Sequence, residues 1–198
     1  TLVVLTPAIP ADHKEWAWFR EQGFRIEKRS QMLGHLSEGK MVMAVAGTHG
    51  KTTTSTLAAW LNHAAAGEGS AFLGGISTNF ASNLVLGEGR RLVVEADEYD
   101  RSFLRLWPDV AVITATDADH LDIYGTAEAM VEAFEQFASQ IKEGGSLILK
   151  QGVAFHFDTK GRNLYRYSCD AGGDFHAENI RLIEGGHYRY DIVLPDGR

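Results

Sequence analysis

The chain has 198 residues, which is long enough for one large or two small domains with a well-filled core. Its 44% hydrophobic and 23% charged residues are typical of a soluble globular protein. The formal net charge of -7 argues against nucleic acid or an anionic membrane surface as the main partner. Cys169 is the single cysteine, which excludes an internal disulfide framework and favours a reducing compartment, the cytoplasm.

The first part of the chain predicts a short β-α-β-α run. The expected elements, in order, are strand Leu2–Leu5, a helix capped by Asp12, strand Phe24–Glu27, and helix Gln31–Ser37 capped by Ser30. Because this run is too short to form its own core, we expect residues 1–39 to be the end of a preceding α/β domain. Residues 40–198 would then form a second, incomplete domain, and the chain would be a piece of a longer protein.

An apolar run followed by a glycine-rich segment predicts a strand, a phosphate-binding loop and a helix. The run Met41–Ala46 is typical of a buried strand. Loop amides and the first amides of a helix lack backbone partners and bind anions, to which a lysine adds a full positive charge. The G-x-x-G-K-T spacing is shorter than that of the usual P-loop, so this loop must wrap phosphates differently. Seven residues form the predicted nucleotide site: Gly47, Thr48, His49, Gly50, Lys51, Thr52 and Thr53.

The sequence also predicts a helix after this loop and a strand after that helix. Four apolar residues recur at helical spacing and predict the face that packs on the sheet: Leu57, Trp60, Leu61 and Ala64. A strand over residues 70–73 runs into Gly74 and Gly75, which indicate either a substrate-contacting loop or a tight turn. Asn79 follows in a polar loop.

An acidic cluster follows the second buried-strand pattern, Arg91–Glu95. Clustered carboxylates are costly unless a cation lies among them or they face solvent, and both readings stay open for Asp97, Glu98 and Asp100. Glu95 lies nearest the strand, at the end where open α/β sheets bind ligands. Glu95 is therefore the strongest candidate for a functional carboxylate.

A histidine flanked by aspartates follows the third buried-strand pattern, Val110–Thr114. His120 lies close in sequence to Asp117, Asp119 and Asp122. A neutral imidazole binds divalent metals well, and a neighbouring carboxylate can orient its second nitrogen. We expect a role for His120 at a metal or phosphate site, against the alternative of an ordinary surface histidine.

The rest of the chain predicts a parallel crossover followed by short strands. Thr126 is expected to cap a helix over Ala127–Lys142, and strand Ser146–Lys150 then completes a right-handed crossover. Short strands joined by turns are expected in four further segments: Val153–Phe157, Asn163–Ser168, Phe175–Ile183 and His187–Leu194. The predicted fold class is α/β, with a mostly parallel sheet, a P-loop-type mononucleotide-binding central domain and a small antiparallel β portion near the C-terminus.

The order and separation of these motifs resemble the Mur ligase family. Four segments carry the resemblance: Gly47-Thr48-His49-Gly50-Lys51-Thr52, Gly74-Gly75, Glu95-Ala96-Asp97-Glu98-Tyr99-Asp100 and Asp119-His120-Leu121-Asp122. The loop and the Glu-Ala-Asp-Glu run are most similar to the branch that joins L-alanine to UDP-N-acetylmuramate. The resemblance covers essentially the whole chain.

The resemblance implies an ATP-dependent amide ligase of peptidoglycan precursor synthesis. In such a ligase ATP phosphorylates a carboxylate, and an amine then attacks the acyl phosphate. The N-terminal domain would bind the UDP-linked substrate, and the central domain ATP and Mg²⁺. A C-terminal domain, absent from this chain, would bind the amino acid. Neither nucleic acid binding nor membrane insertion is expected.

The resemblance also assigns roles to residues. Lys51 would hold the β- and γ-phosphates, Thr52 and Glu95 would ligate the Mg²⁺ between them, and His120 would bind a second metal. Lys51, Glu95 and His120 are thus the predicted catalytic residues, and Thr52, Glu95 and His120 the predicted metal ligands. Asp97, Glu98 and Asp119 are expected to support these residues. Possible substrate contacts are His49, Gly74, Gly75, Asn79 and Glu98.

Other readings stay open. A recycling ligase that joins UDP-N-acetylmuramate to a ready-made tripeptide shares the loop and the acidic run, although Ile113–Gly125 is more similar to the alanine-adding branch. A non-catalytic nucleotide-binding module would keep Lys51 and Thr52 but has no need for Glu95 together with His120. A kinase-like phosphotransferase would need a phosphoryl-acceptor pocket, which the sequence does not indicate.

Overall fold

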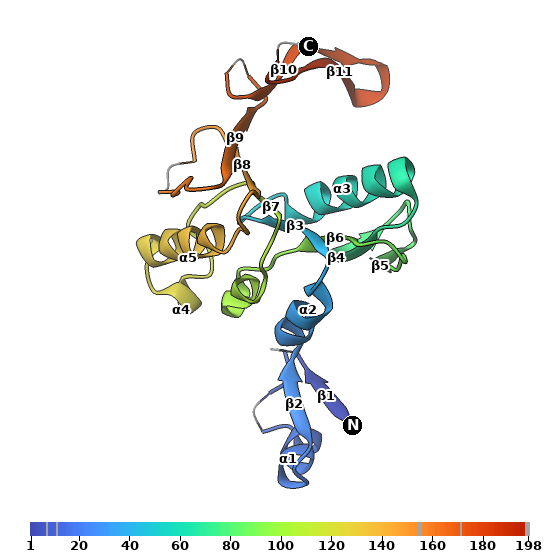
Figure 1. Ribbon diagram of the computed structural model, residues 1–198, viewed down its shortest axis with the longest axis vertical. Coiled ribbons are helices and arrows are strands. Elements are labelled where there is room, and N and C mark those ends of the chain that lie inside the picture. The colour runs from blue at the N-terminus through green and yellow to red at the C-terminus, as the bar shows by residue number, and fades with distance from the viewer. Residues whose placement is uncertain (7, 11, 154–155, 171, 197–198) are drawn as a thin grey trace.

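A single large sheet organises the molecule. The computed structural model describes residues 1–6, 8–10, 12–153, 156–170 and 172–196. Within these ranges the large sheet has nine strands in the order β11-β10-β9-β8-β7-β3-β6-β4-β5 (Figure 1). The strands are β3 (Met41–Ala46), β4 (Ser70–Ser77), β5 (Ser82–Val85), β6 (Arg91–Glu95), β7 (Val110–Ile113), β8 (Ser146–Lys150), β9 (Asn163–Ser168), β10 (Phe175–Ile183) and β11 (His187–Val193).

The sheet is parallel except at its two edges. All neighbouring pairs from β10 to β4 are parallel, whereas β10–β11 and β4–β5 are antiparallel. The mostly parallel sheet and the antiparallel portion near the C-terminus are therefore confirmed. The β10–β11 hairpin, with the 3-10 turn η2 (Glu184–Gly186) at its tip, continues the main sheet because β10 pairs with β9.

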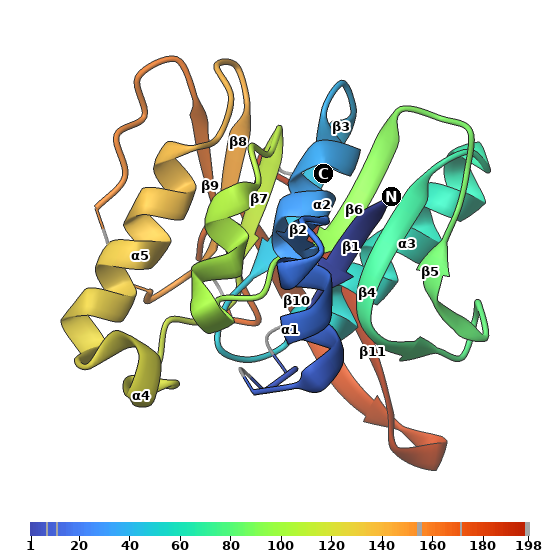
Figure 2. The same ribbon diagram turned by 90° about the horizontal axis from the view of Figure 1, so that it is seen from below.

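Helices cover both faces of the sheet (Figures 1 and 2). Helix α3 (Lys51–Ala66) lies on one face, and α2 (Arg29–Ser37), the 3-10 helix η1 (Tyr99–Arg105) and α5 (Ala127–Ser139) lie on the other. Helix α1 (Lys14–Glu21) packs with the N-terminal strand Arg25–Lys28 instead, and α4 (Leu121–Tyr124) adjoins α5. The larger core lies on the face of α5 and η1, where Phe103, Phe134 and Phe137 pack against alternate residues of the central strands. Thr126 caps α5 as predicted, because its side chain accepts a hydrogen bond from the Ala129 amide at 3.2 Å. None of the described helices is long and apolar enough to cross a membrane.

The N-terminal segment forms a small unit of its own. Strands β1 (Leu2–Leu5) and β2 (Arg25–Lys28) pair in parallel as a separate two-stranded sheet. Two predicted caps are wrong. The N-cap of α1 is His13 rather than Asp12, because the helix begins only at Lys14. Ser30 lies inside α2, whose first turn is closed by the Gln31 side chain accepting from the Lys28 amide at 2.8 Å.

The packing face of α3 differs from the predicted one. Leu57, Trp60 and Leu61 are exposed, and the side chains that meet the sheet are Ser55 and Ala59. Ala59 packs against residues of β4 and β6 in a second, smaller core. Small side chains let α3 lie close to the sheet directly after a four-residue loop. The apolar stripe therefore faces away from the core.

Three further sequence predictions need correction. Gly74 and Gly75 lie inside β4 with negative φ, so they form neither a loop nor a tight turn. Helix α5 ends at Ser139, not Lys142. The expected strand Val153–Phe157 falls partly on residues 154–155, which lie outside the described residues, and Val153, His156 and Phe157 are not in a strand.

We expect stability measurements to report the observed face of α3. Leu61→Ala should change the free energy of unfolding by no more than about 0.5 kcal/mol, because the Leu61 side chain is 66% exposed. Ala59→Leu should destabilise by about 1–3 kcal/mol, because it overpacks the space between α3 and β4. Chemical denaturation of both variants checks this, and the opposite ranking would restore the predicted face.

Candidate active site at the carboxyl edge of the central strands

The sequence-predicted site residues gather where β3, β6 and β7 end. These strands are neighbours and parallel, with Val45 opposite Glu95 and Ala46 opposite Ile113. Amides of the next residues continue the pairing, since Ala96 N donates to Val45 O at 2.8 Å. The three segments that leave these strands therefore begin side by side, at the sheet edge where open α/β proteins bind ligands.

The loop between β3 and α3 is held tightly against the segment after β7. Gly47 has a φ of 128°, and a side chain there would overlap the Thr114 hydroxyl, so only glycine fits. The Thr114 hydroxyl donates to the His49 carbonyl, and Thr48 N donates to Ala115 O at 3.1 Å. Gly50, with a φ of 81°, directly precedes α3.

Lys51, Glu98 and His120 form one charged cluster. The Lys51 ammonium lies 2.8 Å from Glu98 Oε1 and donates to the Gly47 carbonyl at 2.9 Å. His120 Nε2 lies 3.6 Å from the same Glu98 oxygen. The Glu98 side chain is fully buried, whereas those of Lys51 and His120 are 15% and 32% exposed. The cluster therefore has a buried anion at its base and two nitrogen groups nearer to solvent.

Glu95 is the centre of a second cluster. Its carboxylate accepts from the Gly74 amide at 2.8 Å and from the Thr52 hydroxyl at 3.1 Å, and Ser55 Oγ lies 3.4 Å away. A Cβ at position 74 would overlap the carboxylate, so a larger residue there would force the Glu95 side chain to move. The backbone at Gly74 thus closely approaches the Glu95 side chain. Carboxylate and hydroxyl oxygens are ligands that Mg²⁺ prefers.

The structure therefore divides the predicted metal ligands between two clusters. Thr52 and Glu95 lie together, while His120 is placed with Glu98 and Lys51. In the described part of the chain, no three or more His, Cys, Asp or Glu side chains are grouped as a metal site. Where Thr52 and Glu95 alone supply protein oxygens, a magnesium ion would need substrate phosphates and water to complete its coordination.

Several predicted residues lie at the margin of the site. The His49 side chain is 71% exposed, with Nε2 4.0 Å from Asp117 Oδ2. Asp119 lies 3.8 Å from His120 Nδ1, and Asp97 accepts from the Tyr99 amide at 3.1 Å. Thr53 is exposed on the first turn of α3, and Asn79 is exposed in the turn after β4.

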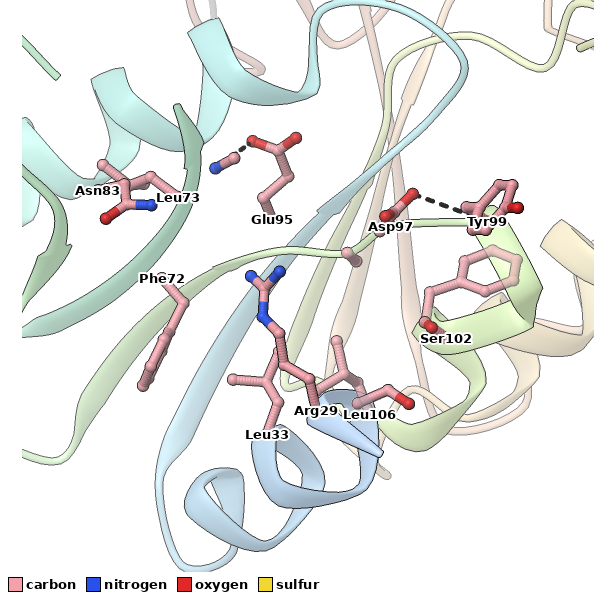
Figure 3. Close-up of a pocket in the computed structure, with 14 residues that line it drawn as sticks. Arg29, Leu33, Phe72, Leu73, Asn83, Glu95, Asp97, Tyr99, Ser102 and Leu106 are labelled. Carbon is pink, nitrogen blue, oxygen red and sulfur yellow. Dashed lines mark hydrogen bonds between the residues drawn. The ribbon is translucent and has the colours of Figure 1, made fainter. Parts of the chain in front are cut away.

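A cavity of about 320 Å³ adjoins Glu95 on the side of α2 (Figure 3). Arg29 rises from the start of α2 with its guanidinium directed toward the end of β6, where Glu95 and Asp97 lie. Asn83 of β5 also lines it. The sequence reading missed Arg29 and named Asn79 in place of Asn83. The four residues of β5, Ser-Asn-Leu-Val, do not alternate polar and apolar side chains, so the sequence offered no signal for Asn83.

Tyr124 closes the base of the site. Its hydroxyl donates to the Glu98 carbonyl at 2.6 Å. Burial, and next the charge of Glu98, raise the pKa of Tyr124 to about 12. The phenol therefore stays protonated and keeps donating throughout the neutral range.

Comparison with known proteins agrees with this architecture. The profile of the Mur ligase middle domain matches residues 45–194. The chain belongs to the Mur ligase family. It is 53% identical over 199 aligned residues to a UDP-N-acetylmuramate–L-alanine ligase of Phocaeicola vulgatus, covering 100% of this chain and 43% of that Mur ligase. The chain thus spans less than half the length of this relative.

Two solved Mur ligase structures share the fold. A UDP-N-acetylmuramate-alanine ligase from Thermotoga maritima superposes with a TM-score of 0.81 at 23% identity, over 100% of this chain and 45% of that one. A UDP-N-acetylmuramate:L-alanyl-gamma-D-glutamyl-meso-diaminopimelate ligase from Neisseria meningitides also gives 0.81, at 21% identity, over 98% and 64%. The fold alone therefore does not separate these two kinds of Mur ligase.

The contact between Gly74 and Glu95 predicts a specific loss of metal affinity. Gly74→Ala should displace the carboxylate and raise the Mg²⁺ concentration that half-saturates nucleotide binding by about tenfold or more. Gly75→Ala is the matched control, because a Cβ there meets Thr52 Cγ2 at an ordinary 3.4 Å. Calorimetric Mg²⁺ titrations check this, and equal midpoints in the two variants would contradict it.

Proposed function

We propose that this chain supplies the nucleotide-binding part of an ATP-dependent ligase that joins L-alanine to UDP-N-acetylmuramate. The observation that carries the proposal is that two pairs, Lys51 with Glu98 and Thr52 with Glu95, lie at the same edge of the sheet, where β3 and β6 end. Within the longer protein, residues 1–39 would end the UDP-substrate domain and residues 40–198 would belong to the central ATP domain. We propose the cytoplasm as its location.

The arrangement suits phosphoryl transfer, which requires positioning and charge neutralisation. We assign the β- and γ-phosphates to the loop amides and Lys51. One buried polar atom supports this assignment: the Thr48 hydroxyl has no hydrogen-bond partner within the described residues. Thr52 and Glu95 would hold the magnesium ion, which neutralises phosphate charge when bound. The present hydrogen bond between them shows that both oxygens already lie within reach of one another.

The reaction class follows from the family. A carboxylate oxygen of UDP-N-acetylmuramate attacks the γ-phosphorus of ATP, ADP leaves, and an acyl phosphate forms. The neutral amine of L-alanine then attacks the acyl carbon, its nitrogen loses one proton to water, and phosphate leaves with the electrons of the broken C–O bond. The side chains of this chain would bind and orient the phosphates and the carboxylate. We assign His120 to the transferring phosphoryl group, because it shares Glu98 with Lys51.

The cavity beside Glu95 is the proposed acceptor site. It carries the Arg29 cation next to Glu95 and Asp97, so a carboxylate bound there gains one favourable and two unfavourable charges. Magnesium at Glu95 would reverse that balance. Binding of an anionic acceptor should therefore depend on the metal. Asn83 supplies a neutral donor and acceptor on the wall formed by β5.

Two other functions remain candidates because the fold is shared. The recycling reaction would use the same site with a tripeptide as the amine. A nucleotide-binding module without ligase activity would need the 47–50 loop but not a cavity beside Glu95. Identity of 53% to an alanine-adding relative favours the alanine reaction.

Phosphate release by the full-length protein tests the function. We expect release that requires both UDP-N-acetylmuramate and L-alanine, and Lys51→Ala should slow it by about a thousandfold or more because transition-state charge loses its counter-charge. Lys40→Ala is the control, since Lys40 donates to Gly89 at the opposite end of β3. Turnover with the tripeptide instead of L-alanine would select the recycling reaction. Nucleotide binding without release would select the module.

Substitution of Arg29 should weaken the binding of UDP-N-acetylmuramate but not that of ATP. Arg29→Met removes the cation of the cavity, so we expect the KM for UDP-N-acetylmuramate to rise about tenfold while the KM for ATP stays within about twofold. Arg20→Met on α1 is the control, because Arg20 stacks over Trp16 away from the cavity. A rise in the KM for ATP, or no change in either, would remove the acceptor from this cavity.

A further inference from the structure

Glu98 is a buried carboxylate at the centre of the site. Its side chain has no exposed surface, although a carboxylate is costly to remove from water unless it is paired. Lys51 at 2.8 Å provides that pairing through Glu98 Oε1. The second oxygen, Oε2, is buried and has no hydrogen-bond partner within the described residues. A half-satisfied buried carboxylate is unusual in a purely structural role and marks a site under functional constraint.

The backbone around Glu98 is arranged to hold this side chain inward. The Tyr124 hydroxyl and the Arg101 amide both donate to the Glu98 carbonyl, at 2.6 Å and 3.0 Å. Asp100 and Arg101 follow with φ of 52° and 53°, the left-handed region that non-glycine residues rarely adopt. Two such residues in succession cost free energy that the surrounding contacts must offset.

Glu98 also fixes the direction of the Lys51 ammonium. An ammonium has three N–H donors on a flexible stem. The Gly47 carbonyl at 2.9 Å and Glu98 Oε1 at 2.8 Å engage two of them, which leaves one for a ligand. Without Glu98, the ammonium would have a single fixed contact. His120 approaches the same carboxylate oxygen from the segment after β7, at 3.6 Å.

We propose that Glu98 is a positioning residue that aligns Lys51 and His120 for the nucleotide phosphates, acting through Lys51 rather than by touching the substrate. This assignment rests on the proposed function. It explains why the acidic Glu98 lies among phosphate-binding residues, because Lys51 neutralises its charge before the ligand binds. It also couples the loop after β3 to the segments after β6 and β7.

A nucleotide-binding cycle in the full-length protein tests the proposal. We expect Glu98→Gln to raise the Kd for Mg-ATP by about tenfold in the wild-type background, and by less than about twofold when Lys51→Met is also present. Glu98→Asp keeps the charge but withdraws it by one methylene, so its Kd should lie between those of wild type and Glu98→Gln. A purely structural carboxylate would give equal losses with and without Lys51.

Glu27→Gln is the matched control, because Glu27 is also a buried carboxylate beside a histidine, His35 at 3.3 Å, but lies in the N-terminal segment. Its Kd for Mg-ATP should equal that of wild type. Wild-type Kd values in Glu98→Gln and Glu98→Asp, or additive effects with Lys51→Met, would overturn the proposal. If the proposed ligase function is wrong, the wild-type protein will bind nucleotide but release no phosphate, and this outcome is distinct from the Kd changes that test Glu98.

Discussion

The parallel pairing of β3 with both β6 and β7 is the constraint on which the candidate site depends. Because these strands share direction and register, the segments that follow them leave the sheet at the same edge. One segment brings the loop and Lys51, one brings Glu95 and Glu98, and one brings Thr114 and His120. A shift of one strand by one residue would move every side chain on it to the opposite face of the sheet. The packing of alternate residues in the two cores therefore also fixes the position of the site.

Charge balance explains how an acidic protein can present a phosphate site. The chain carries a net charge of -7, and acidic residues crowd the edge where phosphates would bind. The structure pairs these acids before a ligand arrives: Lys51 neutralises Glu98, while Glu95 accepts donors from Gly74 and Thr52. A polyanionic ligand therefore depends on bound metal, on the loop amides and on the few cations nearby.

Much of the architecture follows from local pattern. Strands β3, β6 and β8 have the expected bounds, and Thr126 caps α5, because continuous apolar runs and cap residues are local signals. The prediction of the packing face of α3 was wrong. Hydrophobicity favoured Leu57 and Leu61, whereas the small side chains Ser55 and Ala59 let the helix lie close to the sheet. Gly74 was expected in a loop or a tight turn because its contact with Glu95, 21 residues later, is a tertiary feature. Arg29 could not be predicted because the packing of α2 beside the site is a tertiary contact.

We propose that Lys51, Thr52 and Glu95 form one metal–phosphate site, with Glu98 supporting it. A crystal structure of the full-length protein with Mg²⁺ and a non-hydrolysable ATP analogue tests this site most directly. We expect the β- and γ-phosphates on the 47–50 loop, Mg²⁺ about 2.1 Å from Thr52 Oγ1 and from a Glu95 oxygen, and Lys51 bound to phosphate while it stays paired with Glu98. A nucleotide bound elsewhere, or a metal that contacts neither Thr52 nor Glu95, would contradict it.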